Sequence, residues 1–195
     1  MNYLAHCYLS FSDEALLVGN YLGDFVKNRH VDNYPKAIKE GIFLHRKIDR
    51  WTDSHSGFRK GTALLHSSMG KYAPVVLDIY FDYLLTKNWG KFSKQTFQLF
   101  CQKSYHTLQA YAFLMPDNIS DRLQRMISGR WLEKYQSYEG LDVTYGYLAR
   151  RAKFPNQIQD ATSHLQKLEP ELEMVFLDFF PQLVAFAKEE MGTTR

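Results

Sequence analysis

Apolar residues recur at helical spacing along nearly the whole chain, and no two segments show the strict alternation of paired strands. Pro35, Gly70, Pro74 and Pro116 punctuate this pattern at points where helices are expected to begin or end. We therefore predict an all-α fold. After a short apolar start at residues 2–10, the expected helices are about 12–26, 35–53, 54–69, 74–89, 93–115, 119–135, 140–152, 156–167 and 169–190.

The expected helix over 12–26 has a well-marked start and an unusual interior. Ser12 is a good N-cap, because two acids follow it in the first turn. Gly19 and Gly23 lie four residues apart inside the helix, where each glycine costs about 1 kcal/mol relative to alanine. Such a pair needs a compensating gain, and we expect the close approach of another helix or of a bound ion.

The expected helix over 35–53 carries a stripe of polar chemistry. His45, Asp49 and Asp53 follow one another at i, i+4 spacing and therefore share one face. An imidazole and two carboxylates in a row are a ligand set for a divalent metal. The alternative is a solvated face with i, i+3 ion pairs from Arg46 to Asp49 and from Arg50 to Asp53.

Further imidazole and carboxylate groups lie on apolar segments. His6, Asp24, Asp78 and Asp82 are each flanked mainly by apolar residues, and acids are rarely buried unless they are paired or bind a metal. Metal sites inside helical bundles are built from such side chains on facing helices. The alternatives are a hydrogen-bonded core histidine, a helix-capping Asp24, and ion pairs from Asp78 and Asp82 to arginines of the 41–53 segment.

Composition and length fit a packed globule. The chain has 195 residues, of which 45% are hydrophobic and 15% aromatic, so we expect one domain over residues 1–195. No run of 18 uncharged apolar residues exists, which predicts no membrane-spanning helix, and the N-terminus lacks the pattern of a secretory signal. Cys7 and Cys101 form no disulfide framework or zinc motif, which favours free thiols in a cytoplasmic protein.

The charge balance is weak overall but uneven along the chain. A net charge of +3 argues against a nucleic-acid binder. One segment is basic, however, and indicates a surface for an acidic partner. Its cations are Arg122, Arg125, Arg130, Lys134, Arg150, Arg151 and Lys153.

Four ordered motifs give the chain a family resemblance. They are MNYLAH at 1–6, GNYLGDFV at 19–26, GIFLHRKID at 41–49 and LDIYFD at 77–82. With Asn88-Trp89 and Ala149-Arg150-Arg151 further on, the sequence resembles the acyl carrier protein phosphodiesterase family over about its first 150 residues.

The resemblance implies a fold and an activity. The family is regarded as an atypical, all-helical branch of the HD metal-dependent phosphohydrolases, so a single-domain helical bundle of that kind is expected. It would remove the 4′-phosphopantetheine arm from the serine of holo-acyl carrier protein, a reaction linked to fatty acid biosynthesis, with Mn²⁺ preferred and Mg²⁺ or Fe²⁺ as alternatives. One position departs from the family: many relatives are expected to have histidine after the second aspartate, where this chain has Tyr83.

The same resemblance gives each candidate residue a role. Asp24, His45 and Asp49 are the expected catalytic residues, with Asp49 as a further metal ligand or as the group that orients His45 or the attacking water. An arginine would clamp the phosphate. The expected metal ligands are His6, Asp24, His45 and Asp82, with Asp49 and Asp78 as second choices, and the expected substrate-binding residues are Arg46, Arg150 and Arg151.

Two other functions remain open from the sequence. One is a phosphohydrolase of the same architecture that acts on a small phosphoester or nucleotide. The other is a helical module that binds the carrier protein without catalysis. The sequence indicates no oligomeric state.

Overall fold

A computed structural model describes residues 2–192, and within that range the chain forms ten α-helices, joined by short turns and single 3₁₀ segments, and no strand. The all-α prediction is therefore confirmed. None of these helices is long and apolar enough to cross a membrane. The helices are α1 (Tyr3–Tyr8), α2 (Glu14–Leu22), α3 (Lys36–Ser54), α4 (Ser56–Met69), α5 (Ala73–Lys87), α6 (Trp89–Phe92), α7 (Phe97–Ala110), α8 (Asp117–Ser128), α9 (Tyr138–Arg151) and α10 (Ala161–Gly192).

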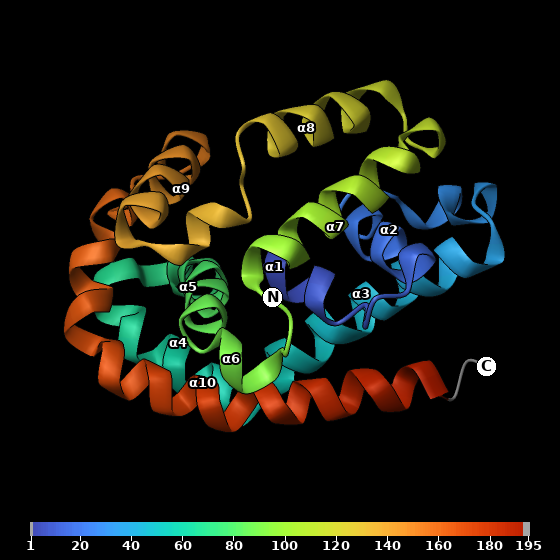
Figure 1. Ribbon diagram of the computed structural model, residues 1–195. Coiled ribbons are helices and arrows are strands. Elements are labelled where there is room, and N and C mark those ends of the chain that lie inside the picture. Colours follow the sequence, from blue (N-terminus) through green and yellow to red (C-terminus); the bar gives the residue numbers. More distant parts are fainter. Residues whose placement is uncertain (1, 193–195) are drawn as a thin grey trace.

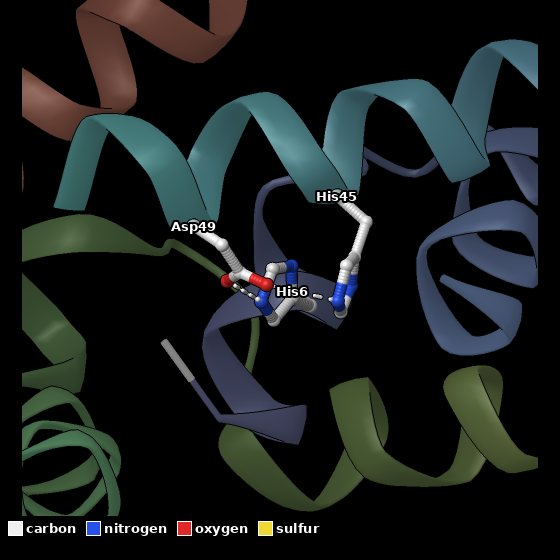
Figure 2. A group of neighbouring side chains, drawn as sticks. All are labelled: His6, His45 and Asp49. Carbon is white, nitrogen blue, oxygen red and sulfur yellow. Dashed lines mark hydrogen bonds and ion pairs between the residues drawn. The ribbon is translucent and has the colours of Figure 1, made fainter. Parts of the chain in front are cut away.

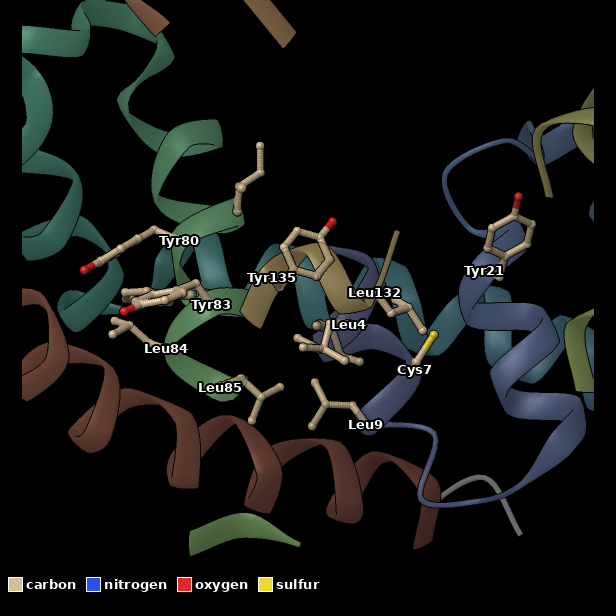
Figure 3. Packing of buried hydrophobic residues seen from close by; sticks show 14 of the residues in the cluster. Leu4, Cys7, Leu9, Tyr21, Tyr80, Tyr83, Leu84, Leu85, Leu132 and Tyr135 are labelled. Carbon is tan, nitrogen blue, oxygen red and sulfur yellow. The ribbon is translucent and has the colours of Figure 1, made fainter. Parts of the chain in front are cut away.

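The short helix α1 lies near the middle of the molecule, with α10 along one edge and α8 and α9 toward the opposite edge (Figure 1). Leu4 and Leu9, at either end of this helix, are fully buried. They pack in one apolar cluster with Leu85 of α5 and with Leu132 and Tyr135 of the segment that follows α8 (Figure 3). The core therefore encloses α1 and fixes the position of every side chain that this helix presents.

Two helix starts differ from those expected. Asp13, not Ser12, is the N-cap of α2, and its carboxylate accepts from the Leu16 N–H at 3.0 Å. Ser12 instead has a left-handed backbone, with φ 66°, in the turn after α1. Likewise His55, not Ser54, caps α4. The difference arises because the turn geometry selects which of two adjacent polar residues has the extended backbone of an N-cap.

The C-terminal helix also differs from the prediction. Two helices were expected over 156–167 and 169–190, but α10 is one continuous helix that contains Pro170 and Pro181. An internal proline removes a backbone hydrogen bond and costs about 3 kcal/mol. Here α10 packs against α3, α4 and α5, and the burial of its long apolar face outweighs that cost.

The two glycines of α2 explain how α2 and α3 approach each other. A Cβ atom at Gly19 would lie 2.3 Å from the Ile38 carbonyl oxygen and 2.6 Å from the Cα of Gly41. A Cβ atom at Gly23 would lie 2.3 Å from Cγ of the His45 ring. The expected close approach of another helix is thus confirmed, and it brings the end of α2 directly against His45.

Candidate metal centre

Three side chains converge where α1 meets α3. His6 belongs to α1, and His45 and Asp49 belong to α3 (Figure 2). One ligand atom from each of them lies within 4.8 Å of the other two. The two imidazole rings stack, with centroids 3.9 Å apart. The i, i+4 spacing of His45 and Asp49 places both side chains on the face of α3 that meets α1.

The carboxylate of Asp49 contacts both imidazoles at their Nε2 atoms. Its Oδ1 is 3.1 Å from Nε2 of His6, and its Oδ2 is 3.1 Å from Nε2 of His45. Asp24, in the turn after α2, places its Oδ1 3.3 Å from the same His45 nitrogen. The side chains of Asp24 and Asp49 are 48% and 40% exposed, so solvent reaches a cluster whose histidines are buried.

A ring of hydrogen bonds orients His6. The Ser10 hydroxyl donates to the His6 carbonyl oxygen (2.9 Å), and the Asn20 amide donates to that hydroxyl oxygen (2.9 Å). The Asn20 Oδ1 must then accept from Nδ1 of His6, at 3.2 Å. In a neutral His6 the lone pair of Nε2 therefore faces Asp49. A neutral His6 therefore gains a favourable contact with Asp49 only when a proton or a metal ion lies between the two acceptors.

Sequence reasoning missed Ser10 and Asn20. Asn20 is 1% exposed, and its amide stands in an otherwise apolar helix turn. A buried amide must form hydrogen bonds, so an asparagine within an apolar helical segment is the feature of the sequence that could have identified Asn20.

Burial and hydrogen bonding set the charges of the metal-free cluster. Burial lowers the pKa of His45, but the hydrogen bonds that its ring donates to Asp24 and Asp49 outweigh burial and raise that pKa to about 9. Burial opposes ionisation of Asp49, yet its hydrogen bonds with His45 and His6 hold its pKa well below the usual range. Burial and the charge of His45 lower the pKa of His6. The metal-free cluster thus contains a charged His45, a neutral His6 and two carboxylates.

This donor set fits a divalent cation. Imidazole nitrogens and carboxylate oxygens together suit Mn²⁺, Fe²⁺ or Zn²⁺, and the second nitrogen of His6 is already held by Asn20, as in many metal-binding histidines. A metal would replace the proton of His45 and satisfy the lone pair of His6. His6, His45 and Asp49 are therefore a possible metal site, with Asp24 beside them.

The structure does not bring Asp82 into this group, although it was an expected ligand. Its two carboxylate oxygens accept from the backbone N–H groups of Leu4 (2.9 Å) and Ala5 (3.1 Å). Burial raises its pKa to about 8, against those two hydrogen bonds, which favour the ionised form. Asp82 thus accepts the hydrogen bonds of two backbone N–H groups in the first turn of α1. Asp49 takes the position beside the two histidines that was expected for Asp82.

The remaining acids also lie outside the group. Asp53, one turn beyond Asp49, is exposed, and Asp78 is enclosed in α5. Among residues 2–192 no ion pair joins Arg46 to Asp49 or Arg50 to Asp53, so the solvated-face alternative does not describe this helix.

The family model for acyl carrier protein phosphodiesterase matches residues 1–183. The chain belongs to the acyl carrier protein phosphodiesterase family. Proteins of Salmonella dublin, Salmonella heidelberg and Salmonella typhimurium that carry this name are 31% identical to it over 193 residues, which is 96% of this chain and 97% of each relative. No solved structure matches the chain significantly. The recognition made from the four motifs is confirmed.

Tyr83, where many relatives were expected to have histidine, makes its contacts away from the candidate centre. Its hydroxyl donates to Oε2 of Glu169 at 3.4 Å, and its ring packs on Tyr80 and Tyr138. Tyr83 therefore belongs to a separate polar cluster between α5, α9 and α10, apart from His6, His45 and Asp49.

The three expected substrate-binding arginines are placed differently from one another. Arg46 donates from Nη2 to the Val26 carbonyl oxygen at 2.6 Å, beside the turn that holds Asp24. Arg150 and Arg151 end α9 and are exposed. The charge of Arg151 lowers the pKa of Tyr3, which burial raises, so Arg151 is near α1.

Proposed function

We propose that this chain hydrolyses the phosphodiester that joins 4′-phosphopantetheine to a serine of holo-acyl carrier protein, with a divalent metal held by His6, His45 and Asp49. The observation that carries the proposal is the convergence of these three side chains within 4.8 Å in a member of this family. Mn²⁺ is the proposed metal, with Mg²⁺ or Fe²⁺ as alternatives. When bound, such an ion polarises the phosphoryl oxygens and lowers the pKa of water.

Asp24 is the proposed general base. Its carboxylate is half exposed and lies 3.3 Å from His45, so one oxygen contacts the centre while the other is open to solvent. Interaction with His45 outweighs burial and lowers its pKa, which keeps it ionised and able to accept a proton at neutral pH. In the metal-free chain His45 holds Asp24 at the centre, and Asn20 orients His6 through its other ring nitrogen, which a metal would not occupy.

The basic segment supplies the proposed docking surface. It spans α8 and α9, which lie toward the same edge of the molecule (Figure 1). Arg130 is paired with Glu133 at 3.1 Å, whereas Arg125, Arg150 and Arg151 are exposed. An acidic carrier protein would be steered to this edge, mainly through its association rate. The cytoplasmic location and the single domain over 1–195 remain predictions.

The direct test is incubation of the purified chain with holo-acyl carrier protein and Mn²⁺, with the mass of the carrier followed over time. We expect loss of the phosphopantetheine mass, none after EDTA, and recovery when Mn²⁺ is restored. Hydrolysis of a small phosphodiester with no action on the carrier protein would favour the small-substrate alternative. Binding of holo-carrier protein without hydrolysis under any of the three metals would favour the non-catalytic module.

The salt dependence of KM further distinguishes a carrier-protein substrate from a small phosphodiester. A docked protein substrate predicts that KM rises steeply between low and physiological ionic strength, because exposed charges are screened within about 10 Å at 0.1 M salt. A small phosphodiester would show little such dependence.

A further inference from the structure

An arginine of α8 is held in an aromatic cage next to α1. Nη2 of Arg122 donates to the Tyr3 hydroxyl at 2.8 Å. Its guanidinium carbon lies 5.8, 5.5 and 5.4 Å from the ring centroids of Tyr3, Phe25 and Trp131. Cation–π contacts on three rings leave the guanidinium little freedom to move. Arg122 is therefore preorganised, unlike the exposed arginines of the same segment.

Two polar groups in this cage have no partner. Nε of Arg122 and the hydroxyl of Tyr21 are buried and make no hydrogen bond within the part of the chain that the structure describes. Tyr21 is 3% exposed, and its ring centroid lies 6.1 Å from that of Tyr3 and 5.4 Å from that of Phe25. No carboxylate pairs with Arg122 among residues 2–192 either. A buried Nε–H and a buried hydroxyl without hydrogen-bond partners are costly, and both can donate to an acceptor.

The cage adjoins the candidate metal centre. Tyr3 precedes His6 by three residues on α1, and Tyr21 precedes Asp24 by three residues at the end of α2, so each tyrosine lies about one helical turn (~5 Å) from a residue of the centre. Beyond the effect of burial, the charges of Arg122 and Asp24 both act on the pKa of Tyr3 and of Tyr21. The cage is therefore close enough to Asp24 for its charge to act on both tyrosines.

We propose that Tyr21 and Arg122 form an oxyanion pocket that binds a non-bridging phosphoryl oxygen of the substrate diester. The inference rests on the proposed function, because it assigns the site's phosphate-binding residues. Burial raises the pKa of Tyr21, which keeps its hydroxyl protonated and able to donate. Arg122 supplies Nε–H and the positive charge, while the Tyr3 hydroxyl holds its Nη2 in place. The exposed Arg150 and Arg151, by contrast, serve docking.

Tyr21→Phe is the sharpest test, because it removes only a hydroxyl that has no hydrogen-bond partner among residues 2–192. The melting temperature should stay the same or rise, while kcat/KM falls at least about tenfold on both holo-carrier protein and a small phosphodiester. Tyr145→Phe is the matched control, since the Tyr145 hydroxyl donates to the Val76 carbonyl oxygen at 2.9 Å. That variant should melt earlier and keep its kcat/KM.

Arg122→Gln tests the charge, with the exposed Arg125→Gln one turn along α8 as control. Inorganic phosphate should raise the melting temperature of EDTA-treated wild type and of Arg125→Gln, but not that of Arg122→Gln or Tyr21→Phe. This binding measurement needs neither metal nor turnover. If wild type hydrolyses neither substrate, the proposed function fails while phosphate binding still decides the pocket.

Two kinetic results would overturn the pocket. One is a kcat/KM within twofold of wild type for both Tyr21→Phe and Arg122→Gln on an active enzyme. The other is a loss confined to holo-carrier protein with unchanged hydrolysis of the small diester, which would assign Arg122 to protein docking. Equal stabilisation of wild type and both variants by phosphate would likewise exclude these residues as its binding site.

Discussion

Two polar clusters in this molecule, one around Glu169 and one around Asp49, differ in how the hydrogen bonds of their carboxylates are completed. In the first, Glu169 of α10 accepts at Oε2 from the hydroxyls of Tyr80 (3.1 Å), Tyr83 (3.4 Å) and Tyr138, and at Oε1 from Lys87 (2.7 Å). Each tyrosine hydroxyl has one proton to give, and Lys87 pairs with Glu169 and also with Glu173 (2.6 Å). The protein alone satisfies this cluster, and nothing in it calls for a ligand.

The second cluster, around Asp49, is arranged differently. Two carboxylates share Nε2 of His45, and a neutral His6 presents a lone pair to Asp49. Around it lie buried polar atoms without partners in residues 2–192: Nδ1 of His45, the Tyr21 hydroxyl and Nε of Arg122. Burial of polar side chains is common to both clusters. What separates a functional cluster from a structural one is whether the chain completes its own hydrogen bonds.

Among the variants that test this comparison, Asp49→Asn should have the largest effect, on catalysis. The amide offers no negative charge to a metal or to His45, so we expect kcat on holo-carrier protein to fall by roughly 1,000-fold, about 4 kcal/mol. Steady-state kinetics with Mn²⁺, alongside circular dichroism, would measure this. Asp53→Asn, an exposed acid one turn further on α3, is the control and should keep full activity. Equal activity in the two variants would remove Asp49 from the centre.

Asp82→Ala should act on folding instead. It leaves the N–H groups of Leu4 and Ala5 buried and unsatisfied at the start of α1, which costs about 2–4 kcal/mol of unfolding free energy. Urea denaturation would show the loss, and Mn²⁺ affinity per folded molecule should change little. Lost Mn²⁺ affinity with unaltered stability would instead restore Asp82 to the ligand set.

The metal-free protein should lose stability as the pH rises from about 6.5 to about 9. Its His45 has a pKa raised to about 9, so the folded chain holds a proton that the unfolded chain releases near its ordinary pKa of 6.5. The contribution is fully present below pH 6.5 and is at most about 3 kcal/mol. Urea titrations in EDTA at several pH values would follow it. Asp82 also titrates in this range, so the pH profile of His45→Gln should be subtracted from that of wild type to isolate the contribution of His45. Identical profiles for the two proteins would refute the prediction.

Glu169→Gln should have the smallest effect, on stability alone. The amide keeps an acceptor for the tyrosines but loses the ion pair with the partly exposed Lys87, which we expect to cost about 1 kcal/mol. Thermal unfolding would detect it, and kcat/KM should stay at the wild-type value. A large loss of activity would mean that this cluster, too, has a functional role.

The sequence by itself determined the fold class and most of the candidate residues. The helical period is local, so it reports which residues share a face before any packing is known, and it placed His45 and Asp49 together on α3. Gly19 and Gly23 likewise predicted a close helix contact, because the free-energy cost of glycine inside a helix must be offset, here by the close packing of α3.

Only the tertiary structure decided which groups meet across helices. Asp49 and Asp82 are both acids on apolar helices, and nothing in their sequence separates them. One faces the imidazoles of His6 and His45, whereas the other meets the backbone N–H groups of α1, which no residue type reveals. The crossing of α1, α2 and α3 also brought Asn20 to His6. Periodicity fixes the face of a helix, but the partner of that face depends on packing between segments distant in the chain.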